Sequence, residues 1–197
     1  MGADSDILAA IANGILFLET SAGLSRFEEK NWTHPGVHAN FLFHSVLGVL
    51  YHSKILDVDF TSGYAISIKA TRYLALPCLM ADLYSNKKEI ATIHLVSGVV
   101  PFVLALSGHD NPHLGNVVVA GNILSLCYYS YERERPWGWY TAGVALLTYF
   151  GVSTLPPDTA KIVYPLGLAG LGYCAYRLSC TVGTATPPPP TPPPRRR

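Results

Sequence analysis

The sequence predicts an all-α fold, a bundle of seven transmembrane helices, from its composition, its apolar stretches and its charge pattern. Hydrophobic residues make up 49% of the 197 residues and charged residues 14%, whereas a typical soluble domain has about 25% charged residues. Mean hydropathy is positive, at +0.25. The net charge of +1 gives no sign of a nucleic-acid partner. We therefore expect an integral membrane protein whose main partner is the lipid bilayer.

Seven apolar stretches are each close to the length that crosses a bilayer, about 20 helical residues. Lipid offers no hydrogen-bond partner to an open backbone, so each stretch is expected to be helical. Short loops with Pro, Gly and Asn separate them. The bundle should form one domain over residues 1–180, with spans at about 7–24, 38–58, 62–84, 90–108, 113–131, 137–155 and 160–180.

Lys and Arg residues are concentrated in alternate loops, as they are in membrane proteins whose cytoplasmic loops are enriched in both. With seven spans, one set of loops holds ten of them and the other set holds two. The charge pattern therefore predicts an outside or lumenal N-terminus and a cytosolic C-terminus, in an endomembrane or the plasma membrane. The larger set is Arg26, Lys30, Lys87, Lys88, Arg133, Arg135, Arg177 and residues 195–197, and the smaller set is Lys54 and Lys161.

The third span, at about 62–84, is the least regular. It contains Lys69, Arg72, Pro77 and Asp82. It is either a tilted span whose charged side chains snorkel to the interfaces, or partly an interfacial segment. Because omitting it would break the charge alternation, the seven-span prediction retains it.

Two segments of similar sequence suggest an internal repeat. Residues 12–18 and 120–126 share four identical positions and a swapped Asn–Gly pair, and both predicted spans run from outside to inside. A 3+1+3 arrangement of two parallel halves would explain the similarity, and transporters use such plans. The alternative is chance similarity between two apolar helices.

Four ionisable residues are the first candidates for a functional site, because such residues are costly inside a membrane. The predicted orientation places Glu19, His44, Asp82 and His94 in the cytosolic third of four different spans. They either share a cavity for proton coupling or acid–base catalysis, or each is hydrated separately near the interface. No named catalytic motif accompanies them, and the sequence predicts neither a metal nor another cofactor.

Lys69 and Arg72 are the second candidate site, together with Asn122. The two cations are three residues apart and lie near one helix face, where they could bind an anionic headgroup or solute. Alternatively, they pair with Asp57 or Asp59. Asn122 is either a substrate-binding amide or a packing residue between helices.

Residues 181–197 are predicted to form a disordered, Pro-rich cytosolic tail that ends in arginines. Pro190, Pro193 and Arg195 match a spacing that SH3 domains bind, and the terminal arginines suit anionic lipids. A retrieval signal and a non-specific tail are the other interpretations.

Three functions follow as hypotheses. The first is a small transporter or carrier for a polar solute or lipid, favoured by the suggested repeat and the polar groups inside spans. The second is a non-catalytic membrane scaffold or assembly factor. The third is a membrane-embedded, lipid-modifying enzyme that uses Glu19, His44 and His94 as acid–base groups, although the lack of a catalytic motif weighs against an enzyme.

Overall fold

The computed structural model describes residues 2–25 and 36–182 and confirms the all-α class, since these residues form helices and no strand. The predicted tail, with Pro190, Pro193 and Arg195, lies outside the described residues. The helices are α1 (Gly2–Ser25), α2 (Gly36–Ser53), α3 (Thr61–Tyr73), α4 (Ala75–Leu83), α5 (Lys88–Leu106), α6 (Pro112–Glu132), α7 (Pro136–Leu146) and α8 (Pro157–Val182).

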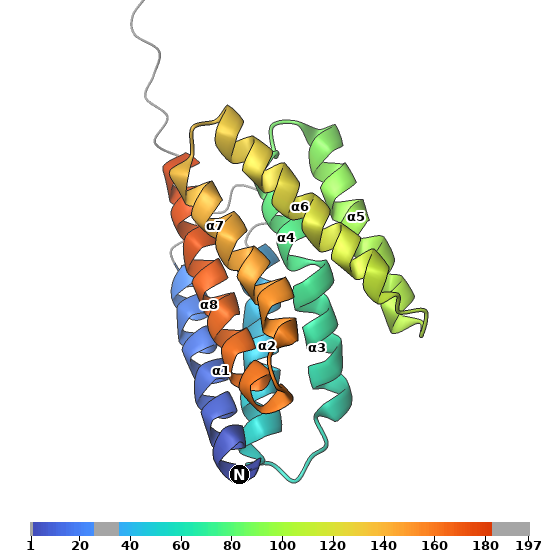
Figure 1. The fold of residues 1–197 in the computed structure, drawn as a ribbon, viewed down its shortest axis with the longest axis vertical. Coiled ribbons are helices and arrows are strands. Elements are labelled where there is room, and N and C mark those ends of the chain that lie inside the picture. Colours follow the sequence, from blue (N-terminus) through green and yellow to red (C-terminus); the bar gives the residue numbers. More distant parts are fainter. Residues whose placement is uncertain (1, 26–35, 183–197) are drawn as a thin grey trace, which may run out of the picture.

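The helices form one elongated bundle in which successive helices alternate in direction along the long axis, except that α4 continues in the direction of α3 (Figure 1). α1 packs against α2 and α8, and α7 covers α8 on its other side. α3 and α4 continue one another and pack on α2, while α5 and α6 lie at the edge of the bundle. The N-terminal ends of α1 and α8 and the loop between α2 and α3 therefore meet at the same end of the molecule.

The second predicted span is shorter in the structure than in the prediction. It was expected to reach residue 58, but α2 ends at Ser53 and Lys54 adopts a left-handed backbone with φ of 50°. Such a residue stops a helix because its carbonyl no longer continues the hydrogen-bond ladder. As a consequence, His44 lies in the middle of its helix rather than in one outer third.

The third predicted span is broken into α3 and α4 at Leu74. Pro77 explains the break, because a proline inside a helix lacks the N–H that would bond the carbonyl four residues before it, that of Tyr73. The freed Tyr73 carbonyl faces α5 at Gly98, where an added Cβ would lie 2.4 Å from the oxygen. α5 can approach so closely only because residue 98 has no side chain.

The sixth predicted span changes helix type along its length. α7 ends at Leu146 and continues as a π-helical turn over Leu147–Gly151 and a 3₁₀ turn over Val152–Thr154. π turns are rare in proteins, but those that occur are often found at functional sites. Tyr149 lies on this π turn and is buried in the bundle.

The core of the described bundle is mainly apolar, but it also contains buried polar side chains, and many large apolar side chains are exposed on the surface. Two helices, Asp4–Ser25 and Lys88–Leu106, are long and apolar enough to cross a membrane, a criterion of length and composition only. Membrane association is thus supported weakly, and the seven-span arrangement stays a prediction. The buried polar residues include Asn13, Thr20, His38, His44, Ser45, His52, Ser67, Thr71, Asn122, Ser130, Thr141 and Thr148.

Candidate functional site

A pocket opens at the end of the bundle where α1, α2 and the following loop meet. Its volume is about 680 Å³, and Asp6, Tyr51, His52 and Lys54 line it together with the loop that leads to α3. Asp6 comes from the second turn of α1, Tyr51 and His52 come from the last turn of α2, and Lys54 directly follows α2, so the two helix ends position these side chains. We call this feature the Asp6 pocket.

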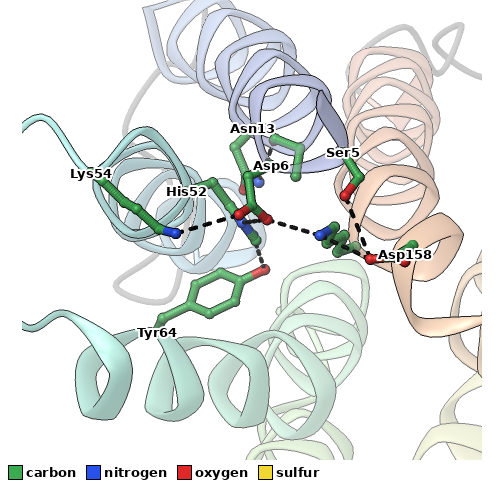
Figure 2. A network of polar contacts seen from close by, with 9 residues as sticks. Ser5, Asp6, Asn13, His52, Lys54, Tyr64 and Asp158 are labelled. Atoms are coloured by element: carbon green, nitrogen blue, oxygen red, sulfur yellow. Dashed lines mark hydrogen bonds and ion pairs between the residues drawn. The ribbon is translucent and has the colours of Figure 1, made fainter. Parts of the chain in front are cut away.

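Asp6 is the centre of a charged network at the pocket (Figure 2). Its carboxylate lies 2.8 Å from the Lys161 ammonium of α8 and 3.5 Å from that of Lys54. Lys161 also lies 3.1 Å from Asp158. His52 turns its Nδ1 toward Asp6 at 3.7 Å, beyond a direct hydrogen bond. The network joins α1, α2 and α8 at one end of the bundle.

From the pocket, aromatic rings lead into the middle of the bundle. The Tyr64 hydroxyl lies 3.3 Å from His52 Nε2, and its ring stacks on Tyr51 with centroids 4.7 Å apart. On the other side, Tyr64 stacks on His44 at 5.3 Å, and Tyr164 of α8 meets the His44 ring edge-on at 5.7 Å. We call Tyr51, His52, Tyr64, His44 and Tyr164 the His–Tyr cluster.

The hydrogen bonds of Ser67 define the tautomer of His44. The Ser67 hydroxyl donates to the backbone oxygen of Tyr64 at 2.7 Å, and its oxygen lies 2.8 Å from His44 Nδ1. Because a hydroxyl has one hydrogen, Nδ1 must be the donor in the second bond. Nε2 of His44 therefore carries a lone pair, and this buried atom has no hydrogen-bond partner among the described residues.

The inner end of the cluster is held rigidly by Thr71 of α3. The Thr71 hydroxyl donates to the Ile68 carbonyl, so the Tyr164 hydroxyl, 2.8 Å away, donates to Thr71. Tyr149 on the π turn donates to the Thr71 backbone oxygen at 2.8 Å. These buried hydroxyls are satisfied, whereas two ring nitrogens of the cluster, Nε2 of His44 and Nδ1 of His52, are buried without a hydrogen-bond partner among the described residues.

Glu19 does not belong to this cluster. Its side chain lies against α8 at Gly172, where an added Cβ would be 2.5 Å from Oε2. Oε2 is buried without a hydrogen-bond partner in the described part of the chain. Asp82, also proposed from the sequence, is half-buried near the end of α4.

His94 and Asn122 form a separate contact between α5 and α6. His94 Nδ1 lies 2.8 Å from the Asn122 side-chain oxygen, and its Nε2 lies 3.1 Å from the Ser125 hydroxyl. Tyr84 stacks on the imidazole with centroids 5.7 Å apart. Asn122 also donates to the Val118 carbonyl. The structure thus brings these two candidates together, in a contact that ties two helices.

Lys69 and Arg72 join α3 to α5 and α6 near Asp110. Lys69 lies 3.2 Å from the Asp110 carboxylate, and Arg72 donates to the Asn116 side chain. The predicted alternative partners, Asp57 and Asp59, lie in the loop before α3, where Asp59 accepts from the backbone N–H of Thr61. Tyr73 also donates to Asp110 at 2.7 Å. This hydrogen bond, followed by the one from Lys69, lowers the pKa of Asp110 below its ordinary value.

The sequence-derived candidates therefore lie in separate clusters, and His44 alone of them belongs to the pocket-linked His–Tyr cluster. Within the described residues, no three His, Cys, Asp or Glu side chains are placed to hold a metal ion. Sequence reasoning missed Asp6, His52, Tyr64 and Lys161. The available signal was the pair of opposite charges, Asp6 and Lys161, each near the start of an apolar stretch.

Comparison with known proteins gives no further guide to function. No family model, no curated protein and no solved structure matches the chain. We therefore infer the function from the positions and contacts of the residues described above.

Proposed function

We propose that this chain is a multi-pass membrane protein that carries a small polar solute. In this proposal the Asp6 pocket is the outer entrance and the His–Tyr cluster is the central binding site. The observation that carries it is a pocket at one end of an apolar-surfaced helix bundle, linked by hydrogen bonds and stacked rings to a buried, unpaired acceptor, Nε2 of His44.

The surface of the bundle supports the membrane part of the proposal. Leu18 of α1 is 68% exposed, and Val117 and Leu124 of α6 are 67% and 70% exposed. Exposed apolar surface on this scale is unusual for a soluble monomer and suits contact with lipid. α5 adds many further exposed apolar side chains and is one of the two helices that pass the test for a span.

The distribution of charge supports the orientation. The loops after α4 and α6 and the C-terminal end of α8 lie at one end of the bundle (Figure 1), and they contain Lys87, Arg133, Arg135 and Arg177. By the positive-inside rule this end faces the cytosol. The Asp6 pocket at the opposite end then faces outside or into the lumen.

The interior favours a carrier over the other two candidate functions. A scaffold needs no polar cluster linked to an open pocket. An acid–base enzyme that uses Glu19, His44 and His94 needs them within reach of one substrate, yet each has its own neighbours on different helices. A carrier needs an entrance, a central site and buried polar groups, and the α1–α2–α3–α8 region offers all of these. The suggested repeat remains a further, untested reason to favour a carrier.

A labelling experiment tests the membrane topology. Asp57→Cys places a thiol in the exposed loop beside the pocket, and Glu134→Cys places one in the loop between α6 and α7. We expect a membrane-impermeant maleimide to label Asp57→Cys in intact cells or oriented vesicles, and Glu134→Cys only after permeabilisation. The unmodified chain gives the background from its own cysteines. Equal labelling of both variants in intact cells would contradict the topology.

An uptake assay tests transport itself. The purified chain is reconstituted in liposomes and assayed with radiolabelled amino acids, monosaccharides, nucleosides and organic cations. We expect uptake of at least one class above protein-free liposomes, and loss of that uptake in Tyr164→Ala. His94→Ala, a change in the separate α5–α6 contact, should retain uptake. A chain with the expected topology that takes up none of these classes would contradict the proposal.

A further inference from the structure

One arginine and three aromatic rings lie together at the end of the bundle opposite the Asp6 pocket. Trp137 and Tyr140 come from the start of α7, and Tyr173 and Arg177 come from the C-terminal part of α8. These two helix ends lie side by side (Figure 1). We propose that these four residues, the aromatic shelf, bind the headgroup phosphate of an anionic phospholipid. The inference rests on the membrane part of the proposed function and adds a lipid ligand to it.

The aromatic shelf holds the Arg177 guanidinium in one place. Its carbon lies 4.6 Å from the centroid of the Trp137 ring and 5.9 Å from that of the Tyr173 ring. One of its N–H groups donates to the Tyr173 hydroxyl at 3.1 Å. Trp137 is itself fixed, because it packs against the apolar core and its ring meets those of Tyr140 and Tyr173. Stacking uses the face of a guanidinium, so the N–H groups at its edge stay available to a ligand.

The charge of Arg177 is exposed and has no carboxylate partner in the described part of the chain. The ion pairs among the described residues use His52, Lys54, Lys69 and Lys161 as cations. The planar fork of a guanidinium matches two oxygens of a phosphate, and such charge-assisted hydrogen bonds are stronger than neutral ones. A phosphate therefore supplies the acceptors that Arg177 lacks.

Exposed aromatic side chains indicate that the shelf lies at the level of lipid headgroups. Tyr140 and Tyr173 are exposed, and so is Trp139, the residue before Tyr140. Tryptophan and tyrosine gather at membrane interfaces, because their rings have an apolar body and a polar group. Lipid phosphates lie at the same interface, and anionic lipids are concentrated in the cytosolic leaflet, which the positive loops place at this end.

Apolar side chains continue from the shelf toward the middle of the bundle along both helices. Leu147 follows Tyr140 by seven residues, and it is exposed on the same face two turns deeper. On α8, Leu166 precedes Tyr173 by seven residues and is also exposed. Between Tyr140 and Leu147, the exposed Gly143 leaves open space where a Cβ would be. An acyl chain can lie along these residues while its phosphate contacts the shelf, a contact that a free phosphate cannot make.

Lipid binding by the purified full chain tests the proposal. The chain in a mild detergent is titrated with phosphatidylglycerol or with phosphatidylcholine, and native mass spectrometry measures the fraction of protein that retains a lipid. We expect phosphatidylglycerol to bind more tightly than phosphatidylcholine. Arg177→Gln should weaken the binding of phosphatidylglycerol by about tenfold. Arg177→Lys should retain part of it, because lysine keeps the charge without the planar fork.

Arg133→Gln is the matched control, because it removes the same charge from an exposed arginine at the same end of the bundle. It should bind phosphatidylglycerol as tightly as the unmodified chain does. Equal losses in Arg133→Gln and Arg177→Gln would overturn the site, since surface charge alone would explain them. Equal affinities of the unmodified chain for the two lipids would also overturn it.

Gly143→Leu distinguishes a bound lipid from a bound free phosphate. Its Cβ meets nothing within 4 Å, so the bundle should stay folded, but the new side chain occupies the space beside the expected acyl chain. We expect weaker binding of phosphatidylglycerol in this variant, and no displacement of the lipid from the unmodified chain by an excess of inorganic phosphate. Complete displacement by phosphate, with no effect of Gly143→Leu, would identify a free-anion site and overturn the lipid proposal.

The binding measurement is independent of transport. Selective binding of phosphatidylglycerol that is lost in Arg177→Gln would support the lipid site even if the chain takes up no solute, and the carrier proposal alone would fall. Solute uptake by a chain that binds both lipids equally would leave the carrier standing and refute the lipid site.

Discussion

Replacing Gly98 by alanine should destabilise the bundle, although alanine usually stabilises a helix. A Cβ at this position would lie 2.4 Å from the Tyr73 carbonyl oxygen and 2.7 Å from Pro77 Cγ, where ordinary contact begins at 3.4 Å. The neighbours are a backbone oxygen and a proline ring, so neither can turn away. α5 must therefore retreat by roughly 1 Å, the difference between 3.4 and 2.4 Å, and overpacking of this kind costs about 1–3 kcal/mol.

Removing glycine from a helix interior returns about 0.5–1 kcal/mol, so the net loss in the free energy of unfolding should reach about 2.5 kcal/mol at most. For a chain of this length, that lowers Tm by up to about 10 °C. Thermal unfolding of the purified protein in detergent measures the change.

Gly121→Ala is the matched control, since nothing lies within 4 Å of the added Cβ. It should raise Tm by about 1–4 °C, because it gains the helix propensity without the clash. If Gly98→Ala proved as stable as Gly121→Ala, the close approach of α5 to the break between α3 and α4 would be wrong.

Two further predictions concern the loop between α5 and α6. Asn111→Ala should lower the free energy of unfolding by about 1 kcal/mol, because the Asn111 side chain caps α6 by accepting from the backbone N–H groups of His113 and Leu114. His109→Ala, in the same loop, should leave Tm unchanged. Equal effects of the two variants on Tm would exclude the cap. Asp110→Asn should remove a part of the folding stability that depends on pH. The pKa of Asp110 is lowered in the folded chain, so its ionised carboxylate stabilises the fold above the unfolded pKa of about 4. That stabilisation is lost as pH falls through the folded pKa. Tm measured from neutral to acid pH should therefore fall less in Asp110→Asn than in the wild type, and parallel curves would refute the interaction of Asp110 with Tyr73 and Lys69.

The helix-by-helix layout could be predicted from the sequence because apolar stretches and turn residues are local signals. The predicted stretches correspond in order to α1, α2, α3 with α4, α5, α6, α7 with its π and 3₁₀ turns, and α8. The break at Leu74 could have been predicted from the sequence, because Pro77 acts on the hydrogen bonding of residue 73, four positions before it. The first four residues of the π turn at Leu147–Gly151 include no proline or glycine. The change of helix type there therefore could not be predicted from the sequence.

The candidate site was harder to predict, because it depends on which helices become neighbours. Depth along a span placed Glu19, His44 and His94 in one layer, but depth does not specify the direction in which a side chain points around its helix. In the structure, Glu19 faces Gly172, His44 faces Tyr64 and Tyr164, and His94 faces Asn122. The pairing of α1 with α8 decides the neighbour of Glu19, the packing of α2 on α3 and α8 decides those of His44, and the packing of α5 on α6 decides that of His94. No local pattern encodes these pairings.

The contact between Asp6 and Lys161 has a consequence for the order of assembly. The two residues are 155 positions apart, in the second turn of α1 and just after the first turn of α8. During synthesis the N-terminal helices are made first, so the Asp6 carboxylate meets Lys161 only after α8 has been made. The contact therefore forms late in synthesis, and it ties α1 to α8.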